Sequence, residues 1–275
     1  MGKALGGGTS INGMVWARGH KNDFDDWAKQ AGDEAWGYRH VLDIYKRIED
    51  WQGVPDPERR GRGGNVIGAG LWEPHDPLLA RRANAAEANL FVKSRPDLNT
   101  PDLHIWHIEA PYVSEVTAQH AVGNAWSISP GLVRPESRGL IKLKSADPRE
   151  APEIHANMLA DPRDLAALRK GMEISRELGN SEAMKPFVKR EILPGDRKGE
   201  ALDNLIRDRA MSMHHPTCTA KMGQDDLSVV DAQLRVYGVR NLRIADGSIM
   251  PTIASGNTQA PCVIIGERLA EILKA

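Results

Sequence analysis

Two adjacent histidines, His214 and His215, stand before Pro216 in a stretch that ends on Cys218. Imidazole is the side chain best suited to proton transfer near neutral pH, so this pair is a candidate for acid/base chemistry. A histidine in a loop is also commonly an ordinary polar residue. The sequence alone leaves both interpretations open.

Metal binding is the alternative for these side chains. The residues that could supply nitrogen and sulfur ligands are His214, His215 and Cys218, with Cys262 or the pair His104 and His107. The H-H-x-x-C spacing matches none of the usual zinc patterns, and adjacent residues seldom ligate one ion. We therefore expect no metal site, and we expect Cys218 to be a small buried apolar residue rather than a nucleophile.

A second polar group lies between Asp246 and Gln259. The spacing predicts a buried strand over 242–245 that ends on Asp246 and Gly247, where an open α/β sheet places ligand-contacting groups. The helix that follows would expose free N–H groups and a positive dipole end at Asn257, Thr258 and Gln259, which suits an anionic ligand. The alternative is that Asp246 closes a turn and Asn257 caps the helix.

The elements that must position these groups follow from periodicity and capping signals. A strand is expected over 232–236, and a final helix from about Thr258 to Leu273 with Pro261 in its first turn. Its expected core stripe is Cys262, Ile265, Leu269, Ile272 and Leu273. Other helices are expected over 23–28, 38–51 and 199–211. A further helix is expected to begin at Asp161-Pro162, with Leu165, Leu168, Met172 and Ser175 on one face. Other strands are expected at 66–67, at the end of 77–93, over 102–108 and over 141–144.

Composition excludes several classes of protein. The chain has 275 residues, 41% of them hydrophobic and 27% charged, which is ordinary for a globular protein of one large or two small domains. A net charge of −1 offers no general attraction to nucleic acid or to an anionic membrane, and no apolar run reaches the roughly 18 residues that a membrane span needs. Two cysteines fit a reducing compartment, so a cytoplasmic location is expected. The seven tryptophans are scattered and are expected to pack in the core rather than stack on bases.

The N-terminus is unusual because Met1 to Met14 is a glycine-dense loop. It has the pattern of neither a signal peptide nor a transit peptide. Glycine runs serve where a backbone approaches another group closely. Either this is a flexible leader or the chain begins part-way through a domain.

Three segments together resemble one family, the glucose-methanol-choline (GMC) oxidoreductases, and most closely its choline or alcohol dehydrogenase branch. The first is Gly2-Lys-x-Leu-Gly-Gly-x-Thr-x-x-Asn-x-Met14 with Trp16-Ala-Arg-Gly19 and Asp23-Phe-Asp-Asp-Trp27. The second runs over 130–165, from Pro-Gly-Leu-Val-Arg-Pro to Asp-Pro-Arg-Asp-Leu. The third runs from His215-Pro216 to Met222-Gly223 and continues with Leu234-Arg-Val-Tyr-Gly, Asn241-Leu-Arg-Ile-Ala-Asp-Gly-Ser-Ile-Met-Pro and Ser255-Gly-Asn-Thr-Gln-Ala-Pro261.

The resemblance implies a flavoenzyme that oxidises a primary alcohol, choline-like or other, to an aldehyde by hydride transfer to FAD. His215 matches the acid/base residue, and Asn257 matches the second member of the catalytic pair. The residues implied to contact FAD are Gly6, Gly7, Thr9, Asn12, Gly13, Met14, Val15, Asp246, Gly247, Thr258 and Gln259. The electron acceptor is not implied, and neither is the choice between oxidase and dehydrogenase.

Two parts of the family pattern are not found: the strand–G-x-G-x-x-G–helix unit that binds the ADP half of FAD, and a central section between about Ala83 and Leu90. The expected fold mixes α/β and α+β: a partial, Rossmann-like FAD-binding domain and a substrate domain with a mainly antiparallel sheet and flanking helices. The expected boundaries are 1–60 for part of the FAD region, 61–212 for the substrate domain and 213–275 for the C-terminal FAD and active-site block.

A cofactor-free remnant, acting as a non-catalytic folded or binding module, is the alternative to the enzyme. Expected partners are a small alcohol and either a second copy or a complementing chain, with no nucleic acid.

Overall fold

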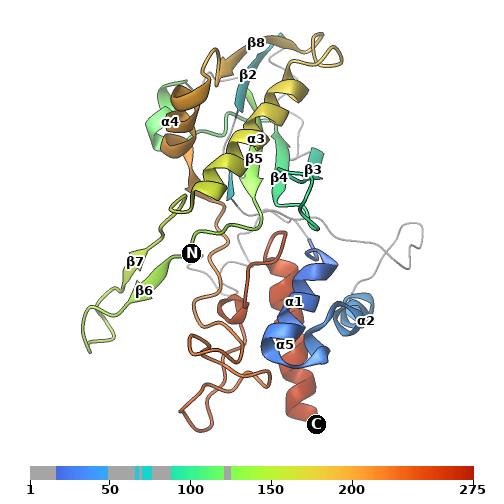
Figure 1. Ribbon diagram of the computed structural model, residues 1–275, viewed down its shortest axis with the longest axis vertical. Coiled ribbons are helices and arrows are strands. Elements are labelled where there is room, and N and C mark those ends of the chain that lie inside the picture. Colours follow the sequence, from blue (N-terminus) through green and yellow to red (C-terminus); the bar gives the residue numbers. More distant parts are fainter. Residues whose placement is uncertain (1–16, 49–65, 68–69, 76–87, 121–124) are drawn as a thin grey trace. The chain divides into compact units, whose positions relative to one another are not determined.

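The computed structural model describes residues 17–48, 66–67, 70–75, 88–120 and 125–275 (Figure 1). The glycine-rich segment, and with it Gly6, Gly7, Thr9, Asn12, Gly13, Met14 and Val15, lies outside the described residues. The chain divides into two compact units, one spanning 1–64 with 214–275 and the other spanning 65–213.

The unit over 65–213 is built on an antiparallel sheet. Its described strands follow the order β3 (Ala88–Val92), β4 (Leu103–Ile108), β5 (Trp126–Leu132), β1 (Val66–Ile67) and β9 (Met211–Ser212). On a second path β5 pairs with β2 (Gly70–Pro74), and β2 pairs with β8 (Val188–Leu193). The strands predicted at 66–67 and 102–108 and at the end of 77–93 are confirmed, while the part of 77–93 before residue 88 lies outside the described residues.

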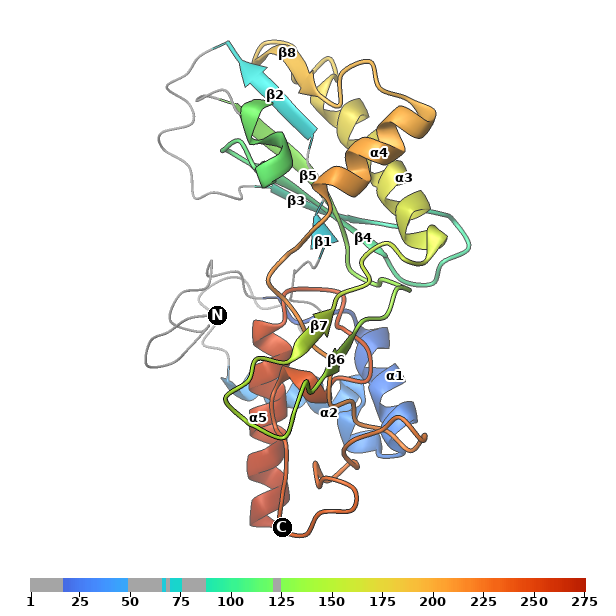
Figure 2. The same cartoon turned by 90° about the vertical axis from the view of Figure 1, so that its left-hand side faces the viewer.

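Helices α3 (Pro162–Gly179) and α4 (Gly199–Arg209) lie side by side against this sheet (Figure 2). Asp161 caps α3 by accepting a hydrogen bond from Arg163 N, and Pro162 occupies the first helical position, as the sequence predicts. The predicted apolar face of α3 is buried, and its residues pack with Leu103 and Leu132 of the sheet. Helix α4 ends two residues earlier than predicted because Met211 joins strand β9.

A separate two-stranded hairpin joins β6 (Leu140–Lys142) to β7 (Glu153–His155). The strand predicted over 141–144 is therefore present but begins and ends earlier. A short 3-10 helix, η4 (Glu115–His120), completes the described elements of this unit.

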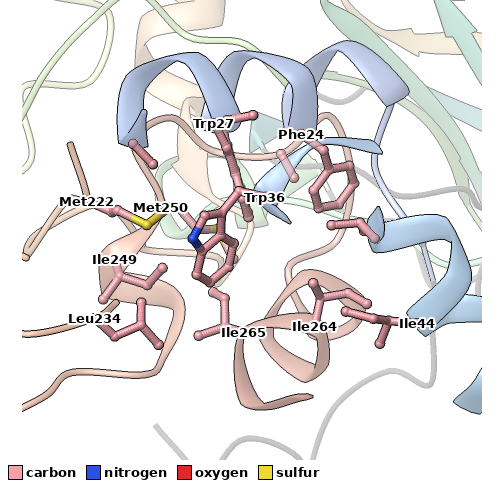
Figure 3. Packing of buried hydrophobic residues seen from close by; sticks show 14 of the residues in the cluster. Phe24, Trp27, Trp36, Ile44, Met222, Leu234, Ile249, Met250, Ile264 and Ile265 are labelled. Carbon is pink, nitrogen blue, oxygen red and sulfur yellow. The ribbon is translucent and has the colours of Figure 1, made fainter. Parts of the chain in front are cut away.

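The other unit packs three helices around one apolar core. These are α1 (Lys21–Ala31), α2 (Tyr38–Ile48) and α5 (Gln259–Lys274), with the 3-10 helices η2 (Glu34–Trp36) and η5 (Gly247–Ile249). Figure 3 shows Trp36 at the centre of this core, with Ile264 and Ile265 of α5 below it and Trp27 of α1 above. Trp27 and Trp36 are fully buried, and each indole N–H donates to a backbone carbonyl at 3.0 Å, so neither loses a hydrogen bond on burial.

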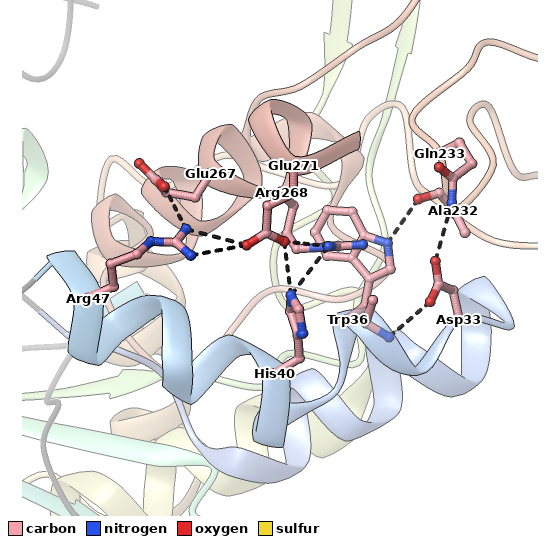
Figure 4. Close-up of polar contacts among 10 residues, drawn as sticks. Asp33, Trp36, His40, Arg47, Ala232, Gln233, Glu267, Arg268 and Glu271 are labelled. Carbon is pink, nitrogen blue, oxygen red and sulfur yellow. Dashed lines mark hydrogen bonds and ion pairs between the residues drawn. The ribbon is translucent and has the colours of Figure 1, made fainter. Parts of the chain in front are cut away.

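Helices α2 and α5 are also joined by ionic contacts at their surface (Figure 4). Glu271 accepts hydrogen bonds from His40 at 2.9 Å and Arg268 at 2.5 Å, and Arg47 bridges Glu267 and Glu271. Burial raises the pKa of Glu271, but these two donors outweigh it and lower the pKa to about 2. The carboxylate therefore stays charged at neutral pH and holds α5 against α2.

The strands predicted over 232–236 and 242–245 are wrong. Among the residues that the structure describes, this region holds isolated bridges such as Arg235 to Arg243 rather than strands. Leu234, Gly238 and Asn241 all have positive φ angles, of 64°, 75° and 58°, which interrupt an extended backbone every few residues. The described part of this unit accordingly shows helices and loops, not the parallel sheet of a Rossmann-like domain.

Helix α5 confirms the predicted final helix, with Pro261 in its first turn. Its buried stripe differs from the prediction: Ile264 and Ile265 are fully buried, whereas Leu273 is 63% exposed in the last turn. No helix in the described part of the chain is long and apolar enough to cross a membrane.

Candidate active site

Backbone hydrogen bonds fix the loop that carries His215. Three N–H groups of the segment 218–222 donate to consecutive carbonyls of η5: Cys218 to Gly247 at 3.3 Å, Ala220 to Ser248 at 2.9 Å and Met222 to Ile249 at 2.7 Å. A Cβ on Gly247 would lie 3.1 Å from Cys262 Sγ and 3.3 Å from Thr217 Cγ2, so the backbone there is in tight contact with both. The loop after His215 is thereby held against the first turn of α5.

A buried carboxylate, Asp23, fixes the loop before α5. Its Oδ2 accepts hydrogen bonds from the backbone N–H groups of Ser255 and His20, each at 2.7 Å, and its Oδ1 accepts from Ser255 Oγ at 2.9 Å. Asp23 is fully buried and also belongs to the capping box of α1. One side chain of α1 thus sets the backbone two residues before Asn257.

The two anchored loops bring His215 between two polar side chains of the α5 start. Asn257 Nδ2 lies 2.9 Å from His215 Nε2, and Thr258 Oγ1 lies 3.1 Å from His215 Nδ1. Asn257 and Thr258 are both buried, while His215 is half-buried. Both ring nitrogens of His215 therefore have a neutral partner, and its ring plane is held from two sides.

Burial makes the charged form of this imidazole unfavourable. It lowers the pKa of His215 to about 4, with a smaller contribution in the same direction from the neighbouring His214. At neutral pH the ring is uncharged, so it can accept a proton.

The start of α5 carries the positive end of the helix dipole. Thr258 stands directly before α5, and its side chain makes no hydrogen bond to the first-turn N–H groups. The N-terminal end of a helix favours negative charge. The His215 ring lies next to this end, so the site can accept a proton at the ring and stabilise negative charge at the helix start.

The structure also places three residues that the resemblance assigns to FAD: Asp246, Gly247 and Gln259. Asp246 is exposed and caps η5 by accepting from Ser248 N at 2.8 Å, so it closes a turn and does not end a buried strand. Gly247 lies against Cys262, and Gln259 is the half-buried first residue of α5.

In the part of the chain that the structure describes, no three His, Cys, Asp or Glu side chains come close enough to hold an ion. Burial, with a smaller contribution from the Asp246 carboxylate, raises the pKa of the Cys262 thiol to about 11. Cys262 is therefore a poor nucleophile at neutral pH, and both cysteines are half-buried and pack against the apolar core.

Asp23 and Ser255 are the site residues that sequence reasoning missed. They stand 232 positions apart, and no local pattern links them. One signal in the sequence was Asp23 itself, which stands where an acidic residue completes the capping box of α1. Another was Gly19, whose φ of 82° lets the backbone pass close to Asp23 and Ala254.

Comparison with known proteins defines first the fold and then the family. The structure superposes on the crystal structure of pyridoxine 4-oxidase from Mesorbium loti with a TM-score of 0.85 over 95% of this chain and 82% of that one, at 19% identity. Two models described as GMC oxidoreductase match the sequence, one over residues 1–107 and the other over 135–266. The chain belongs to the GMC oxidoreductase family, as its motifs predict.

Curated relatives match the chain over most of its length. It is 40% identical to an alcohol dehydrogenase [acceptor] of Pseudomonas putida over 70% of this chain and 35% of the relative. It is also 40% identical to the mitochondrial choline dehydrogenase of Mus musculus over 68% of this chain and 32% of the relative. The chain thus spans about a third of the length of these relatives.

Proposed function

We propose that this chain takes part in the FAD-dependent oxidation of a primary alcohol to an aldehyde, with His215 as the base that removes the hydroxyl proton. The observation that carries this proposal is the neutral His215 ring held between Asn257 and Thr258. Membership of the GMC family and the names of the two relatives support an alcohol as substrate, choline-like or other.

The residues at the site suit the proton transfer. The amide of Asn257 occupies the Nε2 lone pair, and an alcohol hydroxyl can exchange with it as the donor to that atom. The displaced amide would then donate to the alcohol oxygen from the opposite side. Two groups from separate loops would thus orient one small molecule, which is what a positioned general base requires.

The α5 start suits FAD, because the N-terminal end of a helix favours a ring system that gains negative charge on reduction, and the Thr258 side chain does not cap this end. When bound, FAD supplies the oxidant that takes the hydrogen and the electron pair from the alcohol carbon. The residues of this chain that would hold it are Gln259 and the α5 start, Asp246, Gly247 and, in the N-terminal glycine segment, Gly6, Gly7, Thr9, Asn12, Gly13, Met14 and Val15. Thr258, at the start of the same helix, would contact both FAD and His215.

The test is to incubate the purified chain with FAD, remove free flavin, and measure dye-linked oxidation of a series of primary alcohols including choline. We expect a yellow protein whose melting temperature rises with FAD and whose turnover falls about 10²- to 10⁴-fold in His215→Ala, the usual range for loss of a general base. His155→Ala, at an exposed position on the hairpin, is the matched control and should keep full turnover. A colourless chain that FAD does not stabilise would overturn the proposal in favour of a cofactor-free folded module.

A further inference from the structure

We infer that Thr258 is a positioning residue: together with Asn257 it holds the neutral His215 ring in the tautomer whose proton is on Nδ1, so that Nε2 is the atom that accepts the alcohol proton. This inference deepens the proposed function and rests on it for its catalytic meaning. The tautomer itself is a property of the chain alone.

The argument starts from the donors and acceptors around the ring. The amide nitrogen of Asn257 can only donate, and it lies 2.9 Å from Nε2, so Nε2 must present its lone pair. A neutral imidazole carries its single proton on the other nitrogen, which is therefore Nδ1. Thr258 Oγ1, 3.1 Å away, accepts the hydrogen bond from Nδ1–H.

The Thr258 side chain does not cap α5, and its backbone is helical, with φ −82° and ψ −5°. A threonine at the N-cap usually accepts a hydrogen bond from the first-turn N–H groups, but here the side chain makes no such bond. Its hydroxyl is turned to the imidazole instead. Asp161 at the start of α3 shows the usual arrangement in the same chain, with its carboxylate accepting from Arg163 N.

The partner on Nδ1 also matters because it is neutral. A carboxylate in this place would favour the charged ring, whereas a hydroxyl orients the ring without favouring charge. Burial then keeps the ring uncharged and ready to accept. Thr258 therefore fixes the direction of the ring while leaving it a free base.

The experiment measures the tautomer by nitrogen NMR on the chain labelled at histidine, without FAD or substrate, because protonated and bare ring nitrogens have distinct chemical shifts. The His215 signals are assigned by their loss in His215→Gln. We expect a protonated Nδ1 and a bare Nε2 in the unmodified chain, mixed tautomers in Thr258→Val, and a return to the single tautomer in Thr258→Ser. A single tautomer with its proton on Nε2, or Thr258→Val spectra identical to those of the unmodified chain, would overturn the inference.

Two further measurements separate positioning from stability and from the proposed activity. Thr258→Val should lower the melting temperature only through the loss of its hydrogen bond to His215, because its side chain does not cap α5, and Thr258→Ser, which keeps that bond, should melt close to the unmodified chain. If the chain turns over alcohols, Thr258→Val should lower kcat about tenfold, the factor that one ordinary hydrogen bond is worth, with KM little changed. If it does not, the proposed function fails while the tautomer result stands by itself.

Discussion

Asp23 offers the sharpest test of how the fold builds the site. Replacing it with alanine removes the acceptor of three hydrogen bonds and leaves the backbone N–H of Ser255 buried without this partner. An unsatisfied buried donor costs about 1–3 kcal/mol, and the half-buried N–H of His20 adds a smaller loss because water can reach it. We therefore expect Asp23→Ala to lower the free energy of unfolding by about 2–4 kcal/mol.

Urea unfolding followed by tryptophan fluorescence measures this change, since Trp27 and Trp36 lie in the core of the same unit. With a slope of about 1–3 kcal/mol per M, the midpoint should fall by about 0.7 M or more. Asp26→Ala is the matched control on the same helix: its carboxylate pairs with Lys29 at an exposed position and should contribute less than about 1 kcal/mol. Equal midpoints for the two variants would refute the role given to Asp23.

Three other outcomes are expected. Gly247→Ala should destabilise the chain by about 1 kcal/mol or more, because the new Cβ would press on Cys262. Gly266→Ala, which has open space around it in α5, should stabilise the chain by about 0.5–1 kcal/mol. Thermal melts of the two variants test both expectations. The pKa of His215 is about 4 in the folded chain and near 6.5 in the unfolded chain, so between these values the unfolded chain binds the extra proton. The free energy of unfolding should therefore fall as the pH drops from about 6.5 to about 4. Urea melts across this range should show a smaller fall in His215→Gln. Thr258→Asp should raise the pKa of His215 by placing a carboxylate at Nδ1, and a pH titration by NMR that finds no upward shift would contradict the assigned contact.

The helices were largely predictable from the sequence because local signals determine them. Asp161 and Pro162 mark the start of α3, and Pro261 marks the first turn of α5. The strand predicted over 232–236 failed because Leu234 takes a positive φ, which its apolar side chain does not announce.

The site was predictable only in part. His215 and Asn257 were identified from motifs, and the structure places their side chains in contact. Thr258 was assigned to FAD alone, although its hydroxyl lies against His215. The Asp23 to Ser255 contact joins distant segments, and such a pairing depends on tertiary packing that no local pattern encodes.

The most direct test of the proposed chemistry is the rate of flavin reduction when the FAD-loaded chain is mixed with excess alcohol in the absence of oxygen. The loss of the oxidised flavin absorbance is recorded between pH 5 and 8. We predict a rate that changes little over this range, because His215 is already neutral, and a loss of about 10²- to 10⁴-fold in His215→Ala. Reduction of the His215→Ala protein at the unmodified rate would contradict the assignment of His215 as the base.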